Sequence, residues 1–137
     1  MTMTPERLRQ RTKTFAIEII KLSRRLPRTD EARTIKWQML RSGTSVGANY
    51  RAVCRCRSDR DFIAKLGVVI EEADETAFWL EVLVDVEIVT TANAKPLQTE
   101  ADELIRICVA SRETARRNRR ARRAAKRPNR APASVES

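Results

Sequence analysis

The residues best suited to binding a metal ion are four carboxylates in one short stretch: Glu71, Glu72, Asp74 and Glu75. Clustered carboxylates bind hard cations, and in helical bundles they form two-metal centres together with histidine. The sequence contains no histidine, which removes the commonest metal ligand and the commonest general acid or base. We therefore expect no metal, no cofactor and no catalytic residue. We expect these acids instead to pair with basic residues of a neighbouring helix.

The three cysteines, Cys54, Cys56 and Cys108, are a second possible source of chemistry. Cys54 and Cys56 have the spacing of a short metal or redox pair, but positions i and i+2 of a helix point to different faces. Two thiols also leave a zinc site incomplete, so we expect Cys54 and Cys56 to be packing residues. An odd number of cysteines without a secretory signal predicts reduced thiols in a cytoplasmic protein. The apolar run 82–89 is interrupted by two acids and is too short to span a membrane.

Arginine supplies the residues best suited to binding phosphate, because its planar guanidinium matches phosphate oxygens. A first group lies near an expected corner between two helices and consists of Arg51, Arg55, Arg57 and Arg60. A second group fills the C-terminal stretch: Arg112, Arg116, Arg117, Arg119, Arg120, Arg122, Arg123, Lys126, Arg127 and Arg130. Residues 111–137 hold 10 Lys+Arg and 2 Asp+Glu, so they carry +8 of the net charge of +10.

Both arginine groups predict electrostatic, sequence-independent binding of nucleic acid, and arginine-rich segments commonly fold on RNA. Each group has a simpler interpretation. The corner arginines could be solvated and partly paired with Asp59 and Asp61, and the C-terminal stretch could serve only solubility. Trp37, Tyr50 and Trp79 lie on helical stripes, so we expect them in the core or an interface rather than stacked on bases.

Four segments must position these residues, because apolar side chains recur at helical spacing in each of them. The expected helices cover residues 5–26, 31–57, 59–84 and 96–115. Short polar loops join them, which fits an all-α, up-down four-helix bundle. We expect residues 1–115 to form this domain. The basic stretch 116–137 lacks a core face, and we expect it to be largely disordered.

Small residues within the second helix predict close helix packing. Gly43 and Gly47 lie mid-helix, where each costs about 1 kcal/mol relative to alanine unless a neighbouring backbone needs the space. If the second and third helices form an antiparallel pair, the residue numbers of two facing positions add up to about 117. Glu72 then lies near Ser45, and we expect Ser45, Asn49 and Glu72 to share a buried polar network that fixes the register.

Several ordered motifs also resemble those of a known family. They are Gln38-Met39-Leu40-Arg41-Ser42, Ser45-Val46-Gly47-Ala48-Asn49-Tyr50-Arg51-Ala52, Arg55-x-Arg57-Ser58, Asp61-Phe62-Ile63-x-Lys65-Leu66, Glu71-Glu72-Ala73-Asp74-Glu75-Thr76 and Trp79-Leu80. Over residues 15–114 the chain resembles the 23S rRNA intervening-sequence protein family, also called the four-helix bundle protein family. The resemblance implies a bacterial protein with a left-handed up-down bundle that assembles as a homopentamer. The genes of some members lie inside insertions in large-subunit ribosomal RNA genes.

A more distant resemblance bears on function. The accessory protein of diversity-generating retroelements shares the fold implied here and is a basic pentamer that binds nucleic acid and a reverse transcriptase. The long arginine-rich stretch of this chain departs from the short family members. We therefore expect a non-catalytic oligomer that binds nucleic acid, with RNA favoured. The alternative is a protein–protein adaptor, or a scaffold similar to the reverse-transcriptase accessory protein.

Overall fold

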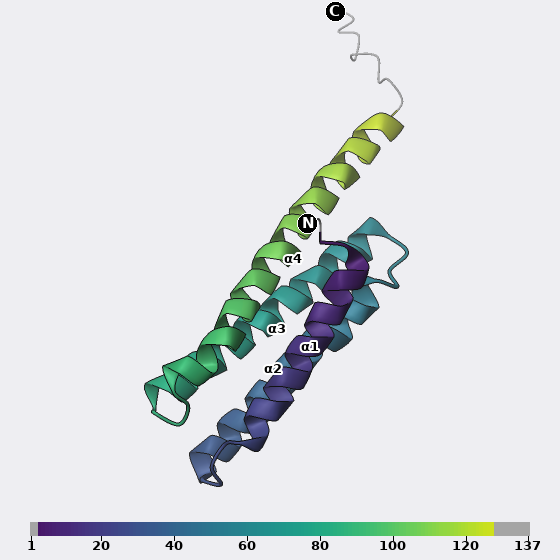
Figure 1. Cartoon of the computed structure of the whole chain (residues 1–137). Coiled ribbons are helices and arrows are strands. Elements are labelled where there is room, and N and C mark those ends of the chain that lie inside the picture. The colour runs from purple at the N-terminus through teal and green to yellow at the C-terminus, as the bar shows by residue number, and fades with distance from the viewer. Residues whose placement is uncertain (1–2, 128–137) are drawn as a thin grey trace, which may run out of the picture.

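The computed structural model describes residues 3–127, which fold into four α-helices joined by short loops (Figure 1). The helices are α1 (Pro5–Arg24), α2 (Asp30–Val53), α3 (Asp59–Asp85) and α4 (Thr91–Lys126). Each runs antiparallel to the helix that precedes it (Figure 1). The predicted all-α, up-down bundle is confirmed. No strand occurs among the residues that the structure describes.

Each helix begins at a hydroxyl side chain that satisfies a free backbone N–H of the first turn. Thr4, Thr29, Ser58 and Thr90 each accept a hydrogen bond from the N–H three residues further on, at 3.2–3.3 Å. The cap at Thr90 starts α4 five residues earlier than the predicted start at Pro96. Proline therefore lies inside the helix and does not begin it.

The core is formed by large apolar side chains from all four helices. Those buried completely include Ile19, Met39, Leu66, Leu80 and Leu104. α2 packs between α1 and α3, and α4 packs against α3. Among the helix pairs that are in contact, α1 and α4, which close the bundle, contact each other least.

The close packing predicted at the two glycines of α2 is confirmed, and the structure shows that the neighbouring helix is α1. A Cβ placed on Gly47 would lie 3.1 Å from the backbone oxygen of Thr12. A Cβ on Gly43 would lie 2.8 Å from Cγ2 of Ile19, a side chain that is fully buried. The two glycines therefore allow a contact that any larger residue would force apart.

The α2–α3 register agrees with the prediction, but the predicted polar network does not form. Ser42 forms a hydrogen bond with Thr76, and Arg41 forms an ion pair with Glu75. The residue numbers of these facing positions add up to 118 and 116, close to the predicted value of about 117.

The side chain of Asn49 donates to the carbonyl of Ser45, one turn back on its own helix, at 2.8 Å. This local bond competes with one across the helices. Oε2 of Glu72 is consequently buried without a hydrogen-bond partner. The polar pair that joins the two helices is Thr76 and Ser42, whose hydroxyl oxygens lie 2.9 Å apart in the buried interface.

α4 continues eleven residues past the predicted domain boundary at residue 115. Arginine and alanine are strong helix formers, and extending an existing helix avoids the cost of nucleation. An ion pair between Arg122 and Asp59 of α3 also fixes the extension to the bundle. The expected disorder therefore does not apply to residues 116–126. Residues 128–137, the rest of the predicted tail, lie outside the described residues.

Candidate nucleic-acid interface

The fold brings the two arginine groups to the same end of the bundle, although some 60 residues separate them in the sequence. The corner between α2 and α3 and the projecting turns of α4 both lie at this end (Figure 1). The ion pair of Arg122 with Asp59, the first residue of α3, joins the two groups. We call this region the basic end. It comprises Arg51, Arg55, Arg57, Arg60, Lys65 and residues 116–127.

On α4, four arginines and one apolar residue of α3 line a hollow of about 280 Å³: Ile63, Arg116, Arg119, Arg120 and Arg123. Arg116 pairs with Glu113 at 2.8 Å, one turn back on the same helix. No ion pair to Arg119, Arg120 or Arg123 occurs within residues 3–127. Their guanidinium groups are therefore available to an external anion.

At the α2–α3 corner, Arg51, Arg55 and Arg57 line a second hollow of about 480 Å³ together with Lys65 and Asp61. The sequence left open whether Asp59 and Asp61 would neutralise these arginines. In the structure Asp59 pairs with Arg122 of α4 instead. Within the described part of the chain, none of the corner arginines forms an ion pair. The corner is thus an open cationic surface.

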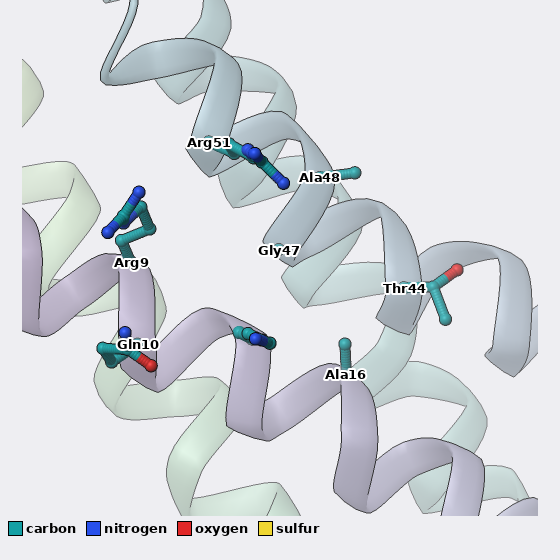
Figure 2. A pocket seen from close by; sticks show the side chains of 8 residues that line it. Arg9, Gln10, Ala16, Thr44, Gly47, Ala48 and Arg51 are labelled. Carbon is teal, nitrogen blue, oxygen red and sulfur yellow. The ribbon is translucent and has the colours of Figure 1, made fainter.

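A third hollow lies between α1 and α2 (Figure 2) and was not predicted from the sequence. Its lining is Arg9, Gln10, Lys13, Ala16, Thr44, Gly47, Ala48 and Arg51. Arg51 and Ala48 also line the corner hollow, so the two hollows are adjacent. Arg9 and Lys13 are one turn apart, a spacing that could have marked them as neighbours. Nothing in the sequence indicated that α1 would lie beside Arg51.

Of the four acids of α3 that were expected to pair with a neighbouring helix, Glu75 is the one that does so among the described residues. Arg41 of α2 contacts Glu75 at 3.1 Å, and Nε1 of Trp79 lies 3.4 Å from the same carboxylate. Burial, and then repulsion from Glu75, raise the pKa of Glu72 above its ordinary value. In the segment that the structure covers, no cluster of three or more His, Cys, Asp or Glu side chains could hold a metal ion.

The cysteines remain unpaired thiols in three different environments. Cys54 is exposed, and the thiol of Cys56 lies 3.5 Å from the carbonyl of Ala52. Cys108 is fully buried, and burial raises its pKa to about 11. The packing role predicted for Cys54 and Cys56 is therefore wrong for Cys54, which faces solvent, whereas Cys108 does pack in the core.

Large apolar side chains on α2, on α3 and at the C-cap of α3 are left uncovered by the bundle. Trp37 is 64% exposed, Phe78 52% and Val86 53%. Trp79 packs its ring edge-on against Phe78, with the ring centroids 4.9 Å apart. Trp37 is thus excluded from the core, which leaves an interface as its predicted alternative. No helix described here is both long and apolar enough to cross a bilayer.

These features define a class: an all-α, up-down four-helix bundle with one strongly basic end. Residues 7–110 match the family described as 23S rRNA-intervening sequence protein. The chain belongs to this family, which confirms the resemblance seen in its motifs.

A similar solved structure comes from Bacteroides thetaiotaomicron and is described as a protein of unknown function from the S23 ribosomal protein family. It is 32% identical to this chain, with a TM-score of 0.71, over 75% of this chain and 95% of that one. No curated protein matches the sequence.

Proposed function

We propose that this protein is a non-catalytic, self-associating bundle that binds nucleic acid, RNA in preference to DNA, through its basic end. The observation that carries the proposal is the convergence of two arginine groups on one end of a rigid scaffold. The arginines of α4 are carried on a helix and so are positioned before a ligand arrives, which reduces the conformational entropy lost on binding. Phosphate neutralised by such cations releases counterions, which supplies most of the affinity.

Self-association is supported by the uncovered apolar surface of α2 and α3. Trp37, Phe78 and Val86 form no part of the core, and their exposure in an isolated bundle costs hydrophobic free energy. We propose that copies of the chain associate through this surface as the homopentamer that the family resemblance implies. Several basic ends in one particle would multiply weak contacts through avidity.

The cytoplasm is the compartment that we propose for this assembly. Three unpaired thiols, one of them exposed on Cys54, are typical of a reducing environment.

The binding test uses fluorescence anisotropy with a labelled RNA hairpin and its DNA counterpart across a salt series. One variant neutralises the corner (Arg51, Arg55 and Arg57→Gln), and a second neutralises the extension (Arg119, Arg120 and Arg123→Gln). A matched control removes three exposed charges from the other end, by Arg24, Arg28 and Arg33→Gln.

Each basic-end variant should weaken RNA binding and reduce the slope of log K against log [salt] by about 2–3, or about 0.7–0.9 for each phosphate that is no longer neutralised. The control should bind like the wild type. Equally weakened binding in all three variants would mean that net charge alone, and not the basic end, determines binding.

The assembly test uses analytical ultracentrifugation of Trp37→Glu and Phe78→Glu. Burying an unpaired carboxylate in an apolar interface is costly, so both variants should shift toward the monomer. A monomeric wild type would contradict self-association. The adaptor alternative gains support if the same surface retains one protein from a nuclease-treated extract and Trp37→Glu releases it.

A further inference from the structure

The groove between α1 and α2 places three cations around one hollow that the rest of the bundle does not fill. Arg9 of α1 and Arg51 of α2 line the hollow from its two sides (Figure 2), and Lys13 of α1 lines it as well. Within residues 3–127, no ion pair involves Lys13 or Arg51. Arg9 pairs with Glu6 at 2.8 Å, but both side chains are well exposed, at 44% and 66%. Exposed pairs of this kind contribute little, so an anion can displace Glu6.

The side chains that line this groove are small enough to leave room for a ligand. Ala16, Gly47 and Ala48 carry at most a methyl group, while the amide of Gln10 can both donate and accept hydrogen bonds. The hydroxyl of Thr44 already donates to the carbonyl of Leu40 at 2.6 Å and does not compete for the cations. The hollow measures about 380 Å³, within the range of about 300–1,000 Å³ usual for small-molecule sites.

The arrangement of the cations fits a chain of phosphates better than a single carboxylate. Arg9 and Lys13 are four residues apart on α1, so they are separated by about 6 Å along the helix. This distance is comparable to that between successive phosphates of an extended strand. Arg51 then connects the groove to the corner hollow, which it also lines. A strand lying in the groove would thus continue onto Arg55 and Arg57.

We propose that the α1–α2 groove is a phosphate-binding site in which Arg9, Lys13 and Arg51 hold a nucleotide unit. It extends the basic end onto a helix to which the sequence assigned no role, and it rests on the proposed function for its ligand. The phosphate can belong to a single-stranded nucleic acid or to a free nucleotide. Arginine and lysine bind both through the same charge-assisted hydrogen bonds.

The test uses the full-length chain, with the double variant Arg9→Gln and Lys13→Gln. Both residues are exposed on a helix, so glutamine preserves the fold, which circular dichroism verifies. The matched control is Arg28→Gln with Lys95→Gln, two exposed cations at the other end of the bundle. One probe is a labelled single-stranded oligouridylate, followed by anisotropy over a salt series. The other is uridine monophosphate, followed through the NMR amide signals of Gly47 in the groove and Gly67, which faces α4.

The groove variant should bind the oligouridylate about tenfold more weakly at low salt than the control does. Its salt slope should fall by about 1.4, because two phosphates are no longer neutralised. If the groove binds only a nucleic-acid strand and no free nucleotide, uridine monophosphate leaves the NMR signal of Gly47 unchanged. If the site also takes free nucleotides, the signal of Gly47 shifts in the wild type but not in the variant, and that of Gly67 stays in place.

Two outcomes separate this proposal from the function on which it rests. In the first outcome, the wild type binds RNA, the two double variants bind equally well, and the Gly47 signal does not shift. This result would overturn the groove as a phosphate site and leave the proposed function of the basic end standing. A wild type that binds no RNA but shows the Gly47 shift would overturn the proposed function and keep the groove as a nucleotide site. Failure of both probes on the wild type would overturn both.

Discussion

Two parts of α4 have the same secondary structure but opposite surroundings. Ala101, Leu104 and Cys108 are fully buried in the bundle, whereas residues 120–127 are exposed on every side. The first part is helical because it buries an apolar stripe against α3. The second is helical because arginine and alanine propagate a helix that the first part has nucleated. A helix can therefore extend from a packed core and carry charge without needing a core of its own.

The largest expected effect is in the packed part of α4. Leu104→Ala should lower the free energy of unfolding by about 2–5 kcal/mol, because it leaves a cavity at a completely buried site. Urea denaturation measures the change. Ala121→Gly in the projecting part is the control: it should reduce local helicity with little effect on global unfolding. An equal destabilisation in the two variants would show that the extension is integral to the core.

Two glycines should respond in opposite directions to alanine. Gly43→Ala inserts a methyl 2.8 Å from the buried side chain of Ile19, and overpacking typically costs about 1–3 kcal/mol. Gly67→Ala meets only the guanidinium of Arg112, at 3.8 Å, and should gain about 1 kcal/mol of helix propensity. Differential scanning calorimetry should show a lower Tm for the first and a higher Tm for the second. A stabilising Gly43→Ala would mean that α1 and α2 pack less closely than described.

The buried pair of hydroxyls should make an intermediate contribution. Thr76→Val keeps the shape of the side chain but removes its hydrogen bond to Ser42, at an expected cost of about 1 kcal/mol. Chemical denaturation of Thr76→Val, Ser42→Ala and the double variant completes a mutant cycle. The double variant should lose less free energy of unfolding than the two single variants lose together, because both single variants remove the same hydrogen bond. Strict additivity would argue against coupling between these hydroxyls.

Removing the projecting part of α4 should affect stability little. A chain ending at Ala115 loses the Arg122–Asp59 ion pair, which is partly exposed and contributes at most about 1 kcal/mol. The Tm of this shortened chain should stay close to that of the full chain, while the affinity for RNA falls sharply. A large fall in Tm would place residues 116–126 within the folding unit.

The smallest effect concerns Glu72 and depends on pH. A raised pKa means that the folded chain binds this proton more tightly than the unfolded chain does. The ordinary pKa of a glutamate is 4.5, and the pKa of Glu72 in the fold is higher. As the pH rises above 4.5, ionisation of Glu72 therefore lowers the stability of the fold. Glu72→Gln should raise the Tm slightly at pH 7 and leave it unchanged near pH 4. A lower Tm at pH 7 would indicate that another group, such as one from a second copy, satisfies this carboxylate.

Much of the fold could be predicted because it depends on local signals. Helical periodicity identified the four helices, and the glycines of α2 predicted a close helix contact without indicating that the neighbour is α1. Two boundaries on α4 were wrong for physical reasons. The cap at Thr90 outweighed the proline at position 96, and propagation carried the helix beyond the last core residue, Ala115.

For the candidate site, the sequence by itself determined which residues carry charge: arginine-rich stretches are visible without any structure. Only the tertiary structure decided which of them lie together, because antiparallel packing brings residues 51–60 and 116–127 to the same end. The pairing of Asp59 with Arg122, and the place of Arg9 and Lys13 beside Arg51, follow from the same packing. Such contacts between distant residues depend on how four helices share one core, and the periodicity within each helix carries no information about them.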